Sequence, residues 1–156
     1  MPERRIVIYG NSGSGKTTMA RRLAEEFSLP CLPLDGLAWA EWAVRKPLPE
    51  AVKEIDAFMD AHPQWVMEGC YADLIEPVLP RCTELRFLNP GVTACINNCR
   101  SRPWEPDKYP SMDAQNEMLD TLIAWVQDYD TRPDDCGLPR HRQLFDSFPG
   151  PKKEFT

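Results

Sequence analysis

Short apolar runs alternate with amphipathic stretches along this chain. The run RRIVIYG at residues 4–10 has Ile6, Val7 and Ile8 at its centre, which is typical of a buried strand. From Lys16 onward the period changes, because apolar residues recur three and four positions apart. They are Met19, Ala20, Leu23, Ala24 and Phe27. This change of period predicts a strand followed by a helix.

The same alternation continues towards the end of the chain. Further strands are expected at PCLPLD (30–35), at QWVMEG (64–69) and at ELRFLNPG (84–91), where Pro90 and Gly91 stop the strand. Helices are expected from about residue 49, after residue 91 and from Ser111, whose hydroxyl can cap a helix. The pattern is weaker beyond residue 130, where we expect a short helix through Leu144 and Phe145 and a last strand at KKEF (152–155).

Two stretches without such a period are expected to be loops. Residues 36–49 carry two Trp, and residues 101–111 carry three Pro, which preclude a helix there. Strands and helices otherwise alternate without internal repeats. The sequence therefore predicts a three-layer α/β fold with a mostly parallel sheet of about five strands, in a single domain, which suits a length of 156 residues.

Composition narrows the classes of function. The net charge of −6 argues against a broad nucleic-acid surface, although 18 Lys and Arg allow a local basic site. No stretch approaches 18 apolar residues, and none long enough for a signal peptide follows MPERR, so we expect a cytoplasmic protein without membrane contact. The six Cys form no C-x-x-C pair, which favours buried reduced thiols over a metal site. The oligomeric state stays open.

The strongest motif lies between the first strand and the first helix. The segment GNSGSGKT at 10–17 matches G-x-x-x-x-G-K-[ST] in full. Small residues let successive backbone N–H groups surround a polyphosphate, and the N-terminus of the following helix favours the same anion. Lys16 adds positive charge, and Thr17 offers a hydroxyl to Mg²⁺. The alternative is an ordinary Gly-Ser turn before a helix. The candidate nucleotide-binding residues are Gly10, Asn11, Ser12, Gly13, Ser14, Gly15, Lys16, Thr17 and Thr18.

Single carboxylates at strand ends favour a kinase over other nucleotide-binding classes. The chain has no N-K-x-D segment of the kind that reads guanine, and its acids are not paired at a strand end. Asp35 ends the second expected strand and Glu68 the third, so both should face the phosphates at the carboxyl edge of a parallel sheet. Glu68 could then bind Mg²⁺ through water, and Asp35 could deprotonate an acceptor hydroxyl. Each acid could instead cap a helix or face water.

Positive charge over the transferred phosphate is expected from the segment after the fourth strand. Arg100 and Arg102 end a helix and enter the Pro-rich loop, and Lys108 could join them. The alternative for the two arginines is a solvated helix end that favours cations. Trp residues lie where an acceptor would enter and in the presumed lid, and they could stack on a ring or simply pack. They are Trp39, Trp42 and Trp104.

Five stretches together resemble the small adenylate-kinase-like and shikimate-kinase-like P-loop proteins, including the group labelled DNA topology modulation protein. They are GNSGSGKTT, LPLDGLAW, WVMEGCY, LRFLNPG and CRSRPWEPDKYPS. The resemblance implies a nucleoside-monophosphate-kinase-type fold, use of ATP with Mg²⁺, and a lid near 100–111. By position it makes Asp35 the acceptor-side acid, Glu68 and Gly69 the D-G pair of adenylate kinases, and Arg100 and Arg102 lid arginines. Cys70 and Tyr71 stand where adenylate kinases carry Pro-Arg.

Two hypotheses follow from these features. The first is an ATP-dependent kinase acting on a small-molecule acceptor, either a metabolite hydroxyl or a nucleotide. The second is a nucleotide-dependent binding or regulatory module without kinase turnover. The kinase predicts a second concave pocket beside the glycine-rich loop, lined by Asp35, Trp39 and residues 100–108, whereas the module predicts a filled or flat surface there.

Overall fold

The computed structural model describes residues 3–41 and 44–156. A sheet of parallel strands runs through it in the order β2-β5-β1-β6-β7. β1 (Arg5–Gly10) lies at the centre between β5 (Trp65–Gly69) and β6 (Glu84–Leu88). The edges are β2 (Cys31–Pro33) and β7 (Lys152–Phe155). The predicted five-stranded parallel sheet is therefore confirmed.

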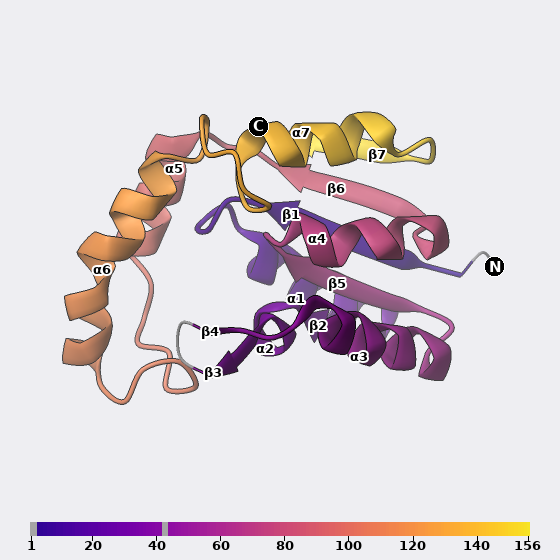
Figure 1. Cartoon of the computed structure of the whole chain (residues 1–156), viewed down its shortest axis with the longest axis horizontal. Coiled ribbons are helices and arrows are strands. Elements are labelled where there is room, and N and C mark those ends of the chain that lie inside the picture. Colours follow the sequence, from indigo (N-terminus) through magenta and orange to yellow (C-terminus); the bar gives the residue numbers. More distant parts are fainter. Residues whose placement is uncertain (1–2, 42–43) are drawn as a thin grey trace.

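Helices cover both faces of the sheet, which gives three layers (Figure 1). Ile6 and Ile8 of β1 share a core cluster with Leu23 of α1 (Lys16–Phe27) on one face. Val7 and Tyr9 belong to the cluster of the opposite face. That face is covered by α3 (Leu48–Ala61), α4 (Ala72–Ile75) and α7 (Leu138–Ser147). Burial on both faces explains why the central strands are continuous apolar runs.

A further helix pair lies beyond the carboxyl ends of the strands (Figure 1). α5 (Val92–Arg100) and α6 (Met112–Gln127) pack on each other through Cys95, Cys99 and Val126. Residues 101–111 join them without forming a helix or strand, as the prolines predict. The expected cap of α6 is also confirmed, because the Ala114 N–H donates to Ser111 Oγ at 3.0 Å. This pair sits beside the corner between β1 and α1.

The prediction of a plain loop at 36–49 is wrong. β2 ends at Pro33, and Asp35 begins the short helix α2 (Asp35–Ala38) instead of ending the strand. An antiparallel pair follows, formed by β3 (Trp39–Glu41) and β4 (Val44–Arg45). Trp42 lies outside the described residues. The short helix η1 (Glu76–Arg81) after α4 also escaped prediction. These elements are too short to give a periodic signal.

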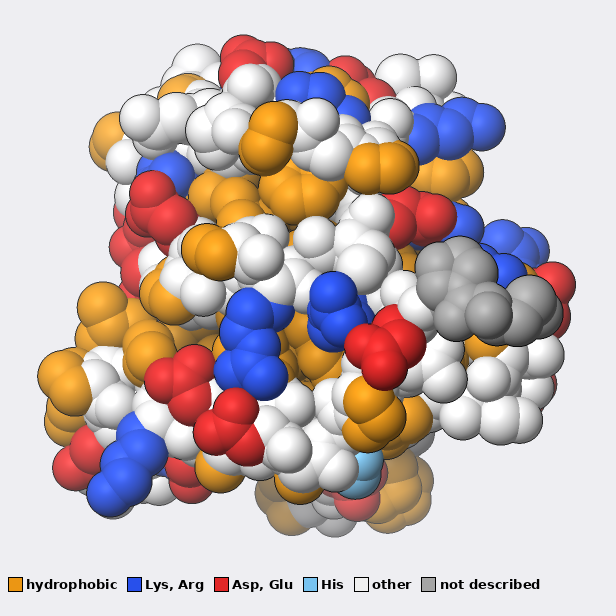
Figure 2. Space-filling view, turned by 90° about the vertical axis from the view of Figure 1, so that its right-hand side faces the viewer, with side chains coloured by type: hydrophobic (Ala, Val, Ile, Leu, Met, Phe, Trp, Pro, Cys, Tyr) orange, Lys and Arg blue, Asp and Glu red, His pale blue; other side chains and the backbone are white. Residues whose placement is uncertain are grey.

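The cysteine side chains are free thiols, and the face shown in Figure 2 carries side chains of both charges. All six cysteines are free, and Cys70, Cys95, Cys99 and Cys136 are buried. On the face at the amino ends of the strands, acidic and basic side chains are interspersed (Figure 2). Within the described ranges, no helix combines the length and the apolar character needed to cross a membrane.

Candidate functional site

The glycine-rich segment forms a tight loop between β1 and α1. Gly13 and Gly15 have positive φ angles of 82° and 98°. Glycine is required at position 13 for a second reason, because a Cβ there would lie 2.3 Å from the carbonyl oxygen of Cys95 on α5. The Ser14 N–H closes the turn onto the Asn11 carbonyl at 3.2 Å. The loop thus leads directly into the N-terminus of a helix, where backbone N–H groups favour an anion.

Two asparagines attach the loop to the helix pair. The buried Asn11 donates from Nδ2 to the carbonyl of Val126 on α6 at 3.3 Å. Asn98 on α5 donates from Nδ2 to the Gly13 carbonyl at 2.8 Å. Lys16 folds back over the loop and donates from Nζ to the Asn11 carbonyl at 2.7 Å. Its ammonium group is therefore held against the loop that the sequence predicts to hold phosphates.

Glu68 places a carboxylate beside this loop. It lies on β5, opposite Ile8 of β1, and is only 5% exposed. The hydroxyl of Thr17 donates to Glu68 Oε2 at 3.3 Å. Burial raises the pKa of Glu68, an effect that the Lys16 ammonium opposes and the Asp35 carboxylate reinforces. A carboxylate and a hydroxyl are hard oxygen donors of the kind that Mg²⁺ prefers. Among the described residues, no group of three or more His, Cys, Asp or Glu side chains is arranged to hold a metal ion.

Asp35 is held by groups from two other segments. The Tyr71 hydroxyl donates to Asp35 Oδ1 at 2.5 Å, and Trp39 Nε1 donates to the Tyr71 oxygen at 3.0 Å. Lys108 Nζ lies 3.4 Å from Asp35 Oδ2. Burial alone would raise the pKa of Asp35, but Lys108, the Tyr71 hydroxyl and Lys16 together lower it. The carboxylate of Asp35 is therefore ionised at neutral pH.

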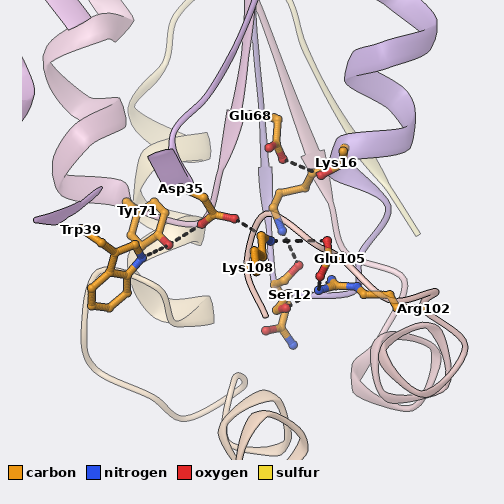
Figure 3. Close-up of polar contacts among 11 residues, drawn as sticks. Ser12, Lys16, Asp35, Trp39, Glu68, Tyr71, Arg102, Glu105 and Lys108 are labelled. Atoms are coloured by element: carbon orange, nitrogen blue, oxygen red, sulfur yellow. Dashed lines mark hydrogen bonds and ion pairs between the residues drawn. The ribbon is translucent and has the colours of Figure 1, made fainter. Parts of the chain in front are cut away.

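The Pro-rich segment 101–111 brings its charges to the same place. Arg102 Nη2 donates to the Ser12 hydroxyl of the loop at 3.4 Å. Glu105 lies between the cations, 4.0 Å from Arg102 and 3.6 Å from Lys108. Burial lowers the pKa of Lys108, but Asp35 and Glu105 outweigh it and raise the pKa. Figure 3 shows the resulting row of alternating charges from Asp35 to Arg102, which contacts Ser12 at its end.

The structure brings most of the predicted site residues together. Asp35, Glu68, Arg102 and Lys108 all lie around the loop. Arg100 does not, because it is exposed at the last residue of α5, and no hydrogen bond or ion pair in the described part of the chain joins it to the loop. Trp39 is tied to Asp35 through Tyr71, whereas the exposed Trp104 donates to the Tyr109 carbonyl.

Sequence reasoning missed two partners in this site. Tyr71 follows the strand-end Glu68 by three residues, so its place at the carboxyl edge of the sheet was a signal for it. Glu105 lies in the same charged, Pro-rich segment as Arg102 and Lys108, but nothing in its spacing specifies which cations it contacts.

Comparison with known proteins establishes the fold. No protein-family model matches the chain, and no curated protein sequence does. Among solved structures, the crystal structure of an unliganded sugar kinase from Janibacter sp. HTCC2649 is similar, with a TM-score of 0.54. The match covers 92% of this chain and 93% of that chain, at 18% sequence identity. The chain therefore has a kinase-like α/β fold.

Proposed function

We propose that this protein is a phosphotransferase that binds ATP with Mg²⁺ and moves the γ-phosphate to a hydroxyl of a small molecule. The observation that carries the proposal is the meeting of three segments around the glycine-rich loop. Lys16 covers the loop, Glu68 and Asp35 lie on its β5 side, and residues 101–111 reach it through Arg102. In this proposal the whole chain acts as one P-loop domain of the nucleoside-monophosphate-kinase type, and residues 100–111 act as its lid.

Each element of the loop has a role in holding the nucleotide. The backbone N–H groups of residues 10–18 and the N-terminus of α1 would surround the β- and γ-phosphates. The Lys16 ammonium would move its hydrogen bond from the Asn11 carbonyl to phosphate oxygens. Thr17 and Glu68, already 3.3 Å apart, would hold Mg²⁺ directly or through water, with phosphate oxygens as further ligands. The ion would neutralise charge on the transferred group.

On the acceptor side, Asp35 is the proposed general base. It would take the proton of the acceptor hydroxyl as that oxygen bonds to the γ-phosphorus and the bond to the β-phosphate oxygen breaks, releasing ADP. Tyr71 holds one oxygen of this carboxylate in place. Arg102, which contacts Ser12 of the loop, would place positive charge near the γ-phosphate. The exposed Trp39 next to Tyr71 offers a face for an acceptor.

The similar solved structure is that of a sugar kinase, which supports a metabolite hydroxyl as the acceptor. The second candidate function, a nucleotide-dependent binding module, is favoured by one contact. The Lys108 ammonium pairs with Asp35 Oδ2, and this carboxylate would have to receive the proton of the acceptor. A kinase must release this pair when the acceptor arrives, whereas a module would keep it.

One experiment separates these functions. Binding of a non-hydrolysable ATP analogue with Mg²⁺ would be measured by calorimetry for the wild type and for Lys16→Ala. ADP release from ATP would then be measured with sugars, cyclic hydroxy acids and nucleoside monophosphates as acceptors. We expect binding that Lys16→Ala weakens at least about tenfold, since a charge-assisted contact is lost, and acceptor-dependent ADP release. Undiminished binding by Lys16→Ala would refute the phosphate site, and binding without any acceptor-dependent release would favour the module.

A further inference from the structure

Cys70 and Cys136 bring two thiols together in the core of the protein. Their Sγ atoms lie 3.4 Å apart, although 66 positions separate the two residues in the chain. Each residue is buried, with 8% of its surface exposed, and both thiols are free. A disulfide bond is about 2.05 Å long, so the two sulfurs need to approach each other by about 1.4 Å to form one.

Hydrogen bonds hold the backbone close to both members of this thiol pair. The Ala72 N–H donates to the Asp135 carbonyl at 3.0 Å, which joins the segment after Cys70 to the segment before Cys136. The carbonyl of Cys70 also accepts a hydrogen bond from His141 Nε2 at 2.7 Å. The thiols therefore face each other from two segments that are already tied together, and a disulfide between them needs only a small movement.

The thiol pair adjoins the acceptor side of the candidate site. Cys70 directly precedes Tyr71, whose hydroxyl donates to Asp35 Oδ1 at 2.5 Å (Figure 3). On the other side of Cys70, Gly69 packs closely on Leu34, because a Cβ on Gly69 would lie 2.9 Å from Leu34 Cβ. Leu34 in turn precedes Asp35. A movement of Cys70 is therefore passed to Asp35 through both of its chain neighbours.

We infer that Cys70 and Cys136 are a site of reversible oxidation, whose disulfide draws Tyr71 away from Asp35. The oxidant is a peroxide, which is small enough to reach thiols that are 8% exposed. A hydrogen bond between two oxygens weakens beyond about 3.0 Å, so a movement of Tyr71 by less than about 1 Å is enough. The consequence for phosphoryl transfer rests on the proposed function, whereas formation of the disulfide does not.

The oxidation takes place in two balanced steps. The sulfur of one thiolate attacks an oxygen of hydrogen peroxide, the O–O bond breaks, and a sulfenic acid and hydroxide form. The sulfur of the other thiol then attacks the sulfenic sulfur, so that the S–S bond forms, the S–O bond breaks and water leaves. The hydroxide takes up the proton that the first thiol released. The two sulfurs together lose two electrons, and a dithiol reductant reverses the change by thiol–disulfide exchange.

The disulfide makes predictions that inert core packing does not. Because the two cysteines are 66 positions apart, their cross-link restricts the unfolded chain and should raise the melting temperature by at least about 5 °C. Loss of the hydrogen bond from Tyr71 should raise the pKa of Asp35, because this bond lowers the pKa in the reduced protein. If the two thiols only pack in the core, peroxide should leave both of them free and change neither quantity.

The test compares the wild type, Cys136→Ala and Cys82→Ala before and after treatment with hydrogen peroxide. Cys82→Ala is the matched control, because Cys82 lies just before the amino end of β6 and its thiol donates to the Glu84 carbonyl. Peptide mapping by mass spectrometry without reduction would identify linked cysteines, and thermal unfolding would measure stability. NMR titration of the Asp35 carboxyl would give its pKa, and acceptor-dependent ADP release would measure transfer.

Peroxide should link Cys70 to Cys136 and raise the melting temperature in the wild type and in Cys82→Ala, and dithiothreitol should reverse both changes. Cys136→Ala should show neither change, and Cys70→Ser takes its place if that variant does not fold. ADP release by the oxidised wild type should fall at least about tenfold, because the proposed base is no longer positioned.

Two results would overturn the inference. The first is a peptide map of treated wild type without the Cys70–Cys136 link. The second is a linked protein whose Asp35 pKa equals that of the reduced protein. Failure of the proposed function appears separately, as reduced wild type that releases no ADP with any acceptor. In that case the peptide map and the Asp35 titration still decide the inference.

Discussion

Mild acid should destabilise this protein through His141, a fully buried side chain on α7. Its Nε2 lies 2.7 Å from the carbonyl oxygen of Cys70, and its Nδ1 lies 2.7 Å from the hydroxyl of Tyr129. The carbonyl can only accept, so Nε2 carries the proton, and Nδ1 accepts from Tyr129. The ring is therefore neutral. A second proton on Nδ1 would face the hydroxyl and place an unpaired charge in the core.

The size of the effect follows from the pKa of His141. Burial lowers this pKa, and the Lys16 charge adds to the lowering, whereas the hydrogen bond to the Cys70 carbonyl opposes it. The pKa of His141 falls from 6.5 to about 4 as a result. The unfolded ring binds a proton below 6.5, but the folded ring does so only below about 4. The contribution of His141 to stability is therefore fully present above pH 6.5 and is lost as the pH falls from 6.5 to about 4. At about 1.4 kcal/mol per pKa unit, the loss is about 3 kcal/mol.

Urea unfolding between pH 7.5 and 4 would measure this loss in the wild type and in His141→Gln, which keeps one donor and one acceptor. The variant should be less stable at neutral pH and should show a shallower fall in unfolding free energy between pH 6.5 and 4. The chain has two His, so a His62→Gln variant assigns the ring resonances in an NMR titration. A His141 resonance that titrates near 6.5, or equal pH slopes for the wild type and His141→Gln, would refute the reasoning.

Three further substitutions test the site and its support. Asp35→Asn should lower phosphoryl transfer by about 10²–10⁴-fold, the contribution of a general base, while ATP affinity measured by calorimetry stays unchanged; wild-type turnover would remove the proposed base. Gly13→Ala should destabilise the protein by more than the roughly 1–2 kcal/mol of its left-handed backbone, since the new Cβ would also meet the Cys95 carbonyl; urea unfolding at wild-type stability would contradict this contact. Ser111→Ala should cost about 1 kcal/mol in the same assay, through loss of the α6 cap, and a change below a few tenths would show that the cap contributes little.

The sheet was predictable because its strands are buried on both faces. Residues in β1 and β5 are apolar at consecutive positions, and this pattern needs only the local sequence to be recognised. The hairpin of β3 and β4 depends instead on side-chain contacts, one of them with a residue 28 positions further along the chain. Arg45 donates to the Ala38 carbonyl at 3.1 Å and pairs with Asp73 at 3.0 Å. No periodicity within residues 36–49 encodes these partners, which explains the wrong prediction of a loop.

The candidate site likewise contains residues whose place could be predicted from the sequence and contacts that could not. Asp35 and Glu68 could be predicted because the carboxyl ends of parallel strands meet at one edge. The contacts of Asp35 could not be predicted, since the hydrogen bond from Tyr71 and the ion pair with Lys108 depend on loop conformations that no local pattern specifies. Arg100 and Arg102 are equivalent in the sequence, but the end of α5 directs only Arg102 to Ser12.

The two edge strands protect the sheet from self-association. β2 has only three residues and ends at Pro33, which has no N–H to offer a neighbouring chain. β7 carries Lys152 and Lys153, whose charges repel a second copy that would add edge to edge. Neither edge presents a long apolar row of the kind that seeds aggregation. High protein concentrations should therefore be reachable without growth of the sheet between molecules.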